Sequence, residues 1–208
     1  MSIKPPPPDI VVGRLPIYLR ALDSLAKENN DITSSYELGE RLGISSAQIR
    51  KDLSHLGELG KQGTGYNINI LIDKLRDVLK VNREWHVVIM GAGHVGVALA
   101  NYHDFTDHGF KLVGIFDNDK DKIGQPAGNL VIQSSDEAPA VIRKHDVKIA
   151  MIATPGLVAQ QITDMLVASD VQSILCYAPT RLIVPEDVHV QYIDPVSKLQ
   201  HMTYYIKE

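Results

Sequence analysis

Apolar residues recur at helical spacing near the start of the chain. They fall at Leu15, Tyr18, Leu19, Leu22, Leu25 and Ala26, the spacing of one buried helix face. Pro16 suits the first turn of such a helix, because no backbone amide donor is needed there. The pattern therefore predicts an amphipathic helix.

Two shorter helices are predicted next, joined only by the residues "GISS". Capping-box spacing marks their starts, at Ser34 with Glu37 and at Ser45 with Gln48, and Gly43 between them is a typical stop signal. Their apolar positions are Leu38, Leu42, Ile49, Leu53 and Leu56. Two short helices with so brief a connection form a helix-turn-helix.

A glycine-rich segment follows the helix-turn-helix. The glycines within residues 57–65 precede an alternating pattern of Tyr66, Ile68 and Ile70, which predicts a turn-rich hairpin ending in a strand. This order is typical of a winged-helix DNA-binding domain, with Lys61 at the tip of the wing. Two capped helices and a hairpin also occur in domains that never contact DNA, so the pattern alone leaves both interpretations open.

Polar side chains of the second short helix lie away from its apolar stripe: Gln48, Arg50, Lys51, Ser54 and His55. Such side chains can donate hydrogen bonds to phosphates, and Gln and Arg can also reach base edges. The charge balance adds little evidence for DNA binding. Residues 1–82 carry 11 Lys and Arg against 10 Asp and Glu, and residues 83–208 carry 10 against 15. A solvated face explains so small a bias about as well as a phosphate contact does.

A helix from about residue 71 to residue 80 leads to a strand, a glycine turn and a helix over residues 87–105, "VVIMGAGHVGVALANYHDF". The spacing of Gly91, Gly93 and Gly96 is typical of a dinucleotide-binding turn. The first glycine makes the turn, the second admits the pyrophosphate, and the third lets the helix pack on the strand. The unpaired amides of the new helix would face the phosphates.

The next strand, "KLVGIFD", ends in Asp117, where a carboxylate can accept hydrogen bonds from the adenosine ribose hydroxyls. This carboxylate would repel a 2′-phosphate, and no arginine stands beside it in the sequence. We therefore expect NAD(H) rather than NADP(H) as the ligand.

Strands and helices then alternate up to "VHVQYID", which predicts a parallel sheet wound on both faces. A terminal helix is expected in "PVSKLQHMTYYIK". Its apolar side carries Val196, Leu199, Met202 and Ile206. Such a helix could pack on its own domain or on a partner's, and periodicity does not choose between them.

Composition narrows the classes of protein to consider. Apolar residues make up 44% of the 208-residue chain, enough for a packed core. The single cysteine, Cys176, excludes an internal disulfide and fits a reducing interior. No apolar run is long enough to cross a bilayer, and the opening "MSIKPPPPDI" lacks the hydrophobic region of a signal peptide. We expect a cytoplasmic protein.

Candidates for catalysis are few. The eight histidines show no metal-ligand spacing, and no paired carboxylates or serine elbow stand out. We interpret His94 as a neighbour of the pyrophosphate rather than a proton shuttle, and Cys176 as a small core residue rather than a reactive thiol. Hydride transfer needs a substrate pocket and a general acid or base, and neither is visible. We therefore expect a protein that is not an enzyme and binds no metal.

Over nearly its full length the chain resembles the Rex family of bacterial redox-sensing repressors. The resemblance rests on "RLPIYLR", "SSYELGERLGISSAQIRKDLSHLGELGKQGTGY", "GAGHVGVALANY" and "VQYID". It implies a repressor that senses the NADH/NAD+ ratio, and a homodimer whose winged-helix domains bind a two-fold DNA operator. It also implies that NADH favours a closed dimer that releases DNA, whereas NAD+ competes for the site and lets repression persist.

The patterns and the resemblance together predict an α/β protein. A winged-helix domain covers residues 1–82, a Rossmann-like parallel-sheet domain that holds NAD(H) covers residues 83–194, and a helix swapped onto the other subunit covers residues 195–208. The expected DNA contacts are Ser45, Ser46, Gln48, Arg50, Lys51, Ser54, His55, Lys61 and Tyr66. The expected NAD(H) contacts are Gly91, Ala92, Gly93, His94, Val95, Gly96, Tyr102, Asp117, Thr154, Pro155, Tyr177 and Pro179.

The resemblance assigns a switch to Arg20, Tyr102 and Asp194. Tyr102 is similar to the family tyrosine near the nicotinamide that hydrogen-bonds an aspartate of the other subunit when NADH is bound, and Asp194 is similar to that aspartate. Arg20 is similar to the arginine that pairs with the aspartate when the protein is on DNA. One carboxylate with two alternative partners is a two-state element that a ligand can bias.

His94, Cys176 and Pro195 depart from the commoner family pattern. Cys176 and Pro195 lie toward the expected nicotinamide end, so they place the preference for NADH over NAD+ in question. The competing interpretation is a small NAD-dependent oxidoreductase, or a CoA-binding protein built on the same sheet. In that case the N-terminal domain would only pair subunits.

Overall fold

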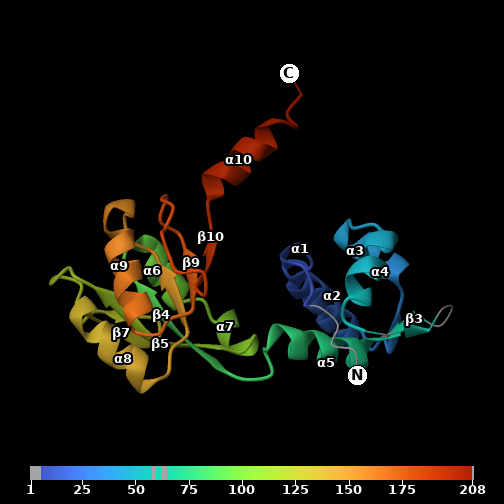
Figure 1. The fold of residues 1–208 in the computed structure, drawn as a ribbon, viewed down its shortest axis with the longest axis horizontal. Coiled ribbons are helices and arrows are strands. Elements are labelled where there is room, and N and C mark those ends of the chain that lie inside the picture. The colour runs from blue at the N-terminus through green and yellow to red at the C-terminus, as the bar shows by residue number, and fades with distance from the viewer. Residues whose placement is uncertain (1–5, 58–59, 62–64, 208) are drawn as a thin grey trace. The chain divides into compact units, whose positions relative to one another are not determined.

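The computed structural model describes residues 6–57, 60–61 and 65–207. The chain divides into two compact parts, residues 1–83 (unit 1) and residues 84–208 (unit 2). Figure 1 shows that unit 1 is largely helical, whereas unit 2 is built around a sheet. Each unit has its own apolar core, so each is described by itself.

Unit 1 combines helices with a small sheet. Its helices are α1 (Asp9–Val12), α2 (Leu15–Lys27), α3 (Ser35–Leu42), α4 (Ser46–Ser54) and α5 (Ile68–Leu79). Its strands β1 (Ile32–Thr33), β2 (Gly60–Lys61) and β3 (Gly65–Asn67) form an antiparallel sheet in the order β1-β3-β2. The helix-turn-helix of α3 and α4, followed by a hairpin, confirms the winged-helix arrangement.

The core of unit 1 follows the predicted apolar stripes. Helix α2 buries Leu15, Tyr18, Leu22 and Leu25, and α4 and α5 add the residues Ile49, Leu53, Leu71 and Leu75. Burial of one such aliphatic side chain contributes about 1.5–3 kcal/mol relative to leaving it exposed. These contacts hold α4 against α2, which orients the outer face of the helix-turn-helix.

The strand expected over Tyr66, Ile68 and Ile70 is wrong. Strand β3 ends at Asn67, whose side-chain Oδ1 accepts a 3.0 Å hydrogen bond from the N–H of Ile70 and so caps α5. Helix α5 therefore starts at Ile68, earlier than expected. The alternating pattern spans the end of a strand and the first turn of a helix, where Ile68 is buried and Ile70 is exposed.

The two predicted capping boxes are only half formed. The hydroxyls of Ser34 and Ser45 accept hydrogen bonds from the N–H groups of Glu37 and Gln48, at 3.1 and 3.2 Å. The side chains of Glu37 and Gln48 do not return to the cap residues in the described part of the chain. Glu37 instead accepts a hydrogen bond from the Thr33 hydroxyl, and Gln48 donates one to a carboxylate of its own helix.

Unit 2 is a seven-stranded sheet with helices on both faces. Its strands are β4 (Trp85–Met90), β5 (Phe110–Asp117), β6 (Pro126–Ala127), β7 (Leu130–Ser134), β8 (Ile149–Ile152), β9 (Ser173–Cys176) and β10 (His189–Tyr192). Its helices are α6 (His94–Ala100), α7 (Asp104–Asp107), α8 (Ala138–Lys144), α9 (Gly156–Ala168) and α10 (Pro195–Thr203), with a 3₁₀ turn η1 (Ser135–Glu137).

The sheet has the order β10-β9-β8-β4-β5-β7-β6, and every pair is parallel except β6 with β7. Alternate residues of β4 point to opposite faces: Val88 and Met90 pack with α8 and α9, and Val87 and Ile89 pack with α6 and α7. This confirms the expected parallel sheet. The strand order reverses direction between β4 and β8, the place where such sheets bind nucleotides.

Helix α10 buries none of its residues. The apolar side chains Val196, Leu199 and Met202 of α10, and Ile206 in the segment after it, are each at least 60% exposed. The helix ends at Thr203, before the end of the expected segment. Within the described residues, α10 therefore does not pack on its own domain.

Candidate functional site

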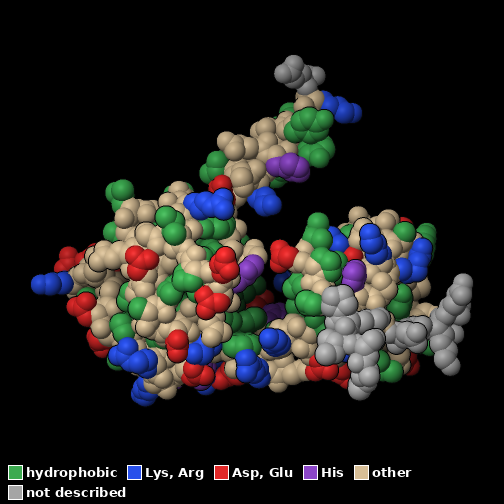
Figure 2. Space-filling view, viewed as in Figure 1, with side chains coloured by type: hydrophobic (Ala, Val, Ile, Leu, Met, Phe, Trp, Pro, Cys, Tyr) green, Lys and Arg blue, Asp and Glu red, His purple; other side chains and the backbone are tan. Residues whose placement is uncertain are grey.

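Helix α4 presents polar side chains on its outer face. Arg50, Lys51 and Ser54 are exposed, whereas Ile49, Asp52 and Leu53 are buried. Figure 2 shows Lys and Arg side chains at the surface over α3 and α4. This face is the arrangement that a DNA-reading helix needs, because phosphate and base contacts both come from exposed donors.

The other expected DNA contacts are distributed around α4. Ser45 caps its N-terminus, Ser46 begins it, and His55 follows its last residue. Tyr66 lies in β3 and packs against the core of unit 1. The backbone of Lys61 lies in β2, but the position of its side chain at the wing falls outside the described residues.

Not all of these donors are free for DNA. The Arg50 guanidinium donates a 2.9 Å hydrogen bond to the Ser35 hydroxyl, which ties α4 to the start of α3. The Ser54 hydroxyl donates to the carbonyl of Lys51 at 2.7 Å. Lys51 thus remains the exposed ammonium of the helix face, with no ion pair among the described residues.

A buried carboxylate holds α4 to α2. Asp52, fully buried on α4, accepts two hydrogen bonds from the Arg14 guanidinium, at 2.6 and 2.8 Å, and one from the Tyr18 hydroxyl at 2.6 Å. Gln48 Nε2, one turn earlier on α4, donates a fourth at 2.7 Å. A buried charge requires such pairing, because an isolated one costs several kcal/mol.

Hydrogen bonding sets the charge state of this cluster. Burial raises the pKa of Asp52, but hydrogen bonds from Arg14, Tyr18 and Gln48 outweigh it and the pKa lies below its usual value. Burial and the neighbouring carboxylate together raise the pKa of Tyr18 to about 12. The cluster therefore consists of an ionised Asp52, a charged Arg14 and a neutral Tyr18 at neutral pH.

The sequence did carry a signal for this cluster. Asp52 lies three residues after Ile49 and directly before Leu53, so helical spacing puts it on the buried face. A carboxylate on a buried face needs a cation. Arg14 lies just before the first predicted helix, and no local pattern assigns it as that partner.

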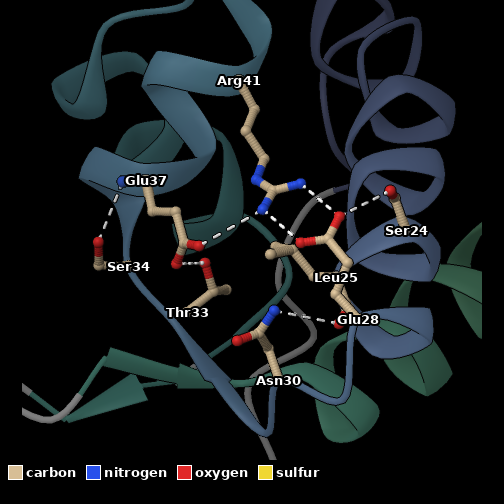
Figure 3. Close-up of polar contacts among 8 residues, drawn as sticks. All are labelled: Ser24, Leu25, Glu28, Asn30, Thr33, Ser34, Glu37 and Arg41. Carbon is tan, nitrogen blue, oxygen red and sulfur yellow. Dashed lines mark hydrogen bonds and ion pairs between the residues drawn. The ribbon is translucent and has the colours of Figure 1, made fainter.

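Arg41, one of the cations counted in residues 1–82, is neutralised within unit 1. Its guanidinium makes a bidentate pair with Glu28 at 2.7 and 2.8 Å and lies 3.9 Å from Glu37 (Figure 3). The hydrogen bonds from Arg41 hold the pKa of Glu28 below its usual range despite the opposing effect of burial. Arg41 therefore joins α3 to the end of α2 instead of adding a cation to the DNA face.

In unit 2 the three glycines have the geometry expected of a nucleotide turn. Gly91 follows β4 with a φ of +101°, and a Cβ there would lie 2.7 Å from the Ala153 carbonyl oxygen. A Cβ at Gly96 would collide with the carbonyl oxygen of Gly91, so this glycine lets α6 approach β4. Gly93, the N-cap of α6, has open space where a Cβ would be. The turn therefore has room for a ligand to reach its backbone.

Asp117 supports this turn from the end of β5. Its Oδ2 accepts a 2.8 Å hydrogen bond from the N–H of Ala92, and its Oδ1 accepts one from the N–H of Asp119 at 2.9 Å. Burial raises the pKa of Asp117, but these two amides and Lys122 bring it below the usual value. The sequence has no arginine beside Asp117, but the predicted site did not include Lys122, whose Nζ lies 3.3 Å from the Asp117 carboxylate.

The remaining nucleotide candidates lie beside the turn. Thr154 and Pro155 follow β8, and Tyr177 and Pro179 follow β9. The Thr154 side chain comes so close to Gly91 that a Cβ there would be 2.7 Å from its Cγ2. Its hydroxyl is buried and has no hydrogen-bond partner in the described structure, so a polar ligand at the reversal point would satisfy it. His94 and Val95, in the first turn of α6, are exposed.

The three expected switch residues are divided between the two units. Arg20 is exposed on α2 of unit 1. Tyr102, in unit 2, donates a 3.0 Å hydrogen bond to Asp104 and packs edge-on against Phe105. Asp194 is exposed, and its Oδ1 caps α10 by accepting a 2.9 Å hydrogen bond from the N–H of Val196.

The described residues offer few other reactive or metal-binding groups. Cys176 is fully buried on β9, and burial raises the pKa of its thiol, as expected of a core residue. Within the described ranges, no three His, Cys, Asp or Glu side chains gather as metal ligands would. Every helix in those ranges is too short or too polar to span a membrane.

Comparison with known proteins matches both units. A family model described as "Putative DNA-binding protein N-terminus" matches residues 8–54, and one described as "CoA binding domain" matches residues 82–180. The redox-sensing transcriptional repressor Rex of Roseiflexus sp. (strain RS-1) is 48% identical over 200 residues. That match covers 96% of this chain and 91% of the relative.

Solved structures agree with the sequence relatives. The structure of RSP in complex with β-NAD+ and operator DNA matches with a TM-score of 0.88 at 33% identity, over 94% of this chain and 90% of that one. The structure of RSP in complex with β-NADH matches with a TM-score of 0.84 at 31% identity, over 95% and 92% of the two chains. The similarity therefore covers both units and the connection between them.

Proposed function

Since the chain belongs to the Rex family of redox-sensing transcriptional repressors, we propose that it represses transcription in response to the NADH/NAD+ ratio. In this proposal it binds a two-fold operator as a homodimer and leaves the DNA when NADH binds. It acts in the bacterial cytoplasm, where the operator is. The coenzyme is a signal and is not consumed.

One observation carries the proposal: a single chain joins a helix-turn-helix to a glycine turn that is open at Gly93. The related RSP structures contain NAD+ with operator DNA in one case and NADH in the other. A protein that holds both kinds of ligand can couple them, provided that each ligand prefers a different arrangement of the protein.

The residues of unit 2 fit a dinucleotide. The open backbone at Gly93 would receive the pyrophosphate, and the unpartnered Thr154 hydroxyl would gain a polar neighbour. Asp117 already uses both of its oxygens to hold Ala92 and Asp119, and its remaining lone pairs would accept ribose hydroxyls. A ribose 2′-phosphate would face this carboxylate, which supports NAD(H) over NADP(H).

In unit 1, α4 would enter the major groove of the operator. Its N-terminal residues Ser45, Ser46 and Gln48 would lie near base edges, and Lys51 would pair with a phosphate. The tie of Arg50 to Ser35 and the Asp52 cluster would hold α4 in position during this contact. Repression then follows from occupancy of the operator.

A homodimer with swapped terminal helices accounts for α10. An amphipathic helix whose apolar side is uncovered in one chain gains stability when a second chain covers it. A two-fold dimer would also present two copies of α4 to a two-fold operator. The helix follows Asp194 directly, so a swap would carry Asp194 toward the partner.

The switch would then operate through Asp194. On DNA its carboxylate would pair with Arg20, and with NADH bound it would accept a hydrogen bond from the Tyr102 hydroxyl of the other subunit. Tyr102 would have to leave Asp104 to reach it. Both states keep the carboxylate partnered, so a small difference in ligand affinity can shift the balance between them.

The match to a family model described as "CoA binding domain" favours a second candidate function. A CoA-binding protein or a small NAD-dependent oxidoreductase would use the same glycine turn. Relatives matching both units are named repressors, which supports the sensor and argues against an enzyme. Competition between CoA and NADH for the protein would separate these readings, because the sensor should ignore CoA.

The proposal is tested by titrating a labelled duplex, selected by the protein from random sequences, at fixed salt with NADH or NAD+ added. Loss of DNA binding with NADH alone is the expected result. Indifference of DNA binding to both nucleotides would contradict the proposal.

A further inference from the structure

The buried carboxylate of Asp52 joins helix α4, which would contact DNA, to helix α2 of the same unit. Arg14 and Tyr18 reach it from α2 and the residue before it, and Gln48 reaches it from α4. The side chain of Asp52 is completely shielded from solvent, whereas that of Arg14 keeps 23% of its surface exposed. The cluster is therefore an anchor beneath the reading face and not part of that face.

The hydrogen bond to Asp52 determines how the Gln48 amide is oriented. An ionised carboxylate only accepts hydrogen bonds, so the amide nitrogen, and not the amide oxygen, must face it. The amide oxygen and the second N–H of Gln48 remain, and within the described residues neither has a hydrogen-bond partner. Gln48 is half-buried and is the third residue of α4, in the first turn, where helix-turn-helix proteins contact bases.

We propose that Asp52 is a positioning residue for sequence recognition, and that it holds Gln48 so that its amide reads an adenine in the major groove. This inference rests on the operator binding proposed above. The free oxygen would accept from the adenine N6 amino group and the free N–H would donate to N7. Guanine and thymine present an acceptor where this oxygen would lie, so they are rejected.

The anchor matters because Gln side chains are flexible. An unrestrained Gln48 amide could rotate and exchange its donor and acceptor ends, and it would then accept other bases. Asp52 removes that freedom, and Arg14 and Tyr18 fix Asp52 itself. The specificity of one base position therefore depends on a residue that never touches DNA.

The experiment is selection from random duplexes followed by affinity measurement at each base position. The proteins are the full-length wild type, Gln48→Ala, Asp52→Asn and the double variant. We expect Gln48→Ala to lose its preference for adenine at one position by roughly 5- to 150-fold. Asp52→Asn should lose preference at that same position, and the double variant should lose no more than Gln48→Ala alone.

A matched control is Asp23→Asn, which breaks the 3.1 Å ion pair between Asp23 on α2 and Arg76 on α5, another carboxylate contact of unit 1, without contacting α4. It should keep the adenine preference. The affinity of every variant for random duplexes should stay within about twofold of the wild-type value, since phosphate contacts are unchanged. The salt dependence of that affinity should likewise match the wild type. If Asp52→Asn does not fold, Tyr18→Phe removes a single hydrogen bond to Asp52 and should weaken the same preference by a smaller factor.

The inference is overturned if Asp52→Asn, or Tyr18→Phe in its place, retains the full preference at the Gln48 position. It is also overturned if preference falls equally at every position, because that pattern indicates general loss of structure. A Gln48→Ala variant that keeps every adenine preference excludes base reading by Gln48. If the wild type selects no sequence at all, the proposed function itself fails.

Discussion

The carboxylate of Asp117, at the end of β5, accepts a 2.8 Å hydrogen bond from the backbone N–H of Ala92 inside the glycine turn. The residue expected to bind the ribose therefore also fixes the turn expected to bind the pyrophosphate. Both halves of the proposed nucleotide site would therefore depend on one side chain. This relationship makes Asp117 the most informative position in unit 2.

Replacing Asp117 with Ala should weaken NADH binding by about 10- to 150-fold, since a hydrogen bond to a charged group contributes about 1.5–3 kcal/mol. Titration calorimetry measures the affinity. Asp121→Ala is the control, because the Asp121 side chain is exposed in the same loop and only its backbone N–H is used, by Asp119. Equal NADH affinity in wild type and Asp117→Ala would show that the ligand does not use this turn.

Lys51→Ala should weaken binding to every duplex by a similar factor, because we propose that the exposed Lys51 ammonium pairs with a phosphate, and phosphate contacts carry no sequence information. The slope of log Kd against log salt should fall by about 1. NADH affinity should not change. Lys120→Ala, an exposed lysine of unit 2, serves as the comparison. An unchanged salt slope in Lys51→Ala would remove this residue from the DNA interface.

Two substitutions at Asp194 separate the effect of its negative charge from its effect as the N-cap of α10. Asp194→Asn keeps an N-cap side chain for α10 but loses the negative charge, whereas Asp194→Ala loses both, at a cost of about 1 kcal/mol in helix stability. Asp194→Ala should bind operator and NADH yet no longer release DNA when NADH is added. Asp194→Asn should bind operator more weakly and still respond to NADH, because its amide oxygen can accept from Tyr102 but cannot pair ionically with Arg20. Polarisation of a labelled operator measures both effects. Normal release by Asp194→Ala would show that the switch assignment is wrong.

The Asp52 cluster predicts a pH dependence of the stability of unit 1. The folded-state pKa of Asp52 lies below its ordinary value, so the ionised form is favoured by folding. The resulting stability is fully present above the unfolded pKa of about 3.9 and is lost as pH falls through the lower, folded pKa. Asp52→Asn should therefore be less stable than wild type at neutral pH, and the difference should shrink below about pH 4.

Urea unfolding followed by circular dichroism tests this prediction. The only tryptophan, Trp85, lies in β4, so its fluorescence reports unit 2 and provides an internal control. The unfolding of unit 2 should be unaffected by the Asp52 change. A stability difference that grows as the pH falls would have the wrong sign.

Local patterns in the sequence predicted much of the fold. The stripe from Leu15 to Leu25, the stop at Gly43 and the turn at Gly91 were all correct, because each depends on a few neighbouring residues. The strand through Ile70 was wrong because a period of two fits both a strand end and the start of a helix. Only the cap formed by Asn67 distinguishes them.

The polar contacts were harder to predict because they join distant segments. Arg14 and Asp52 are 38 residues apart, and Arg41 and Glu28 are 13 residues apart. A sequence shows their charges but not which of them meet. Charge composition alone therefore does not show which cations are available to a ligand, since Arg41 is neutralised by Glu28 and Arg14 supports Asp52 beneath the reading face.

The central claim is that nucleotide and operator favour different states of one protein, and reciprocal linkage tests it most directly. The factor by which saturating NADH raises the Kd for operator should equal the factor by which saturating operator raises the Kd for NADH, and the account predicts about 5- to 150-fold in both directions. Factors of one in both directions would contradict it, because the two ligands would then bind independently.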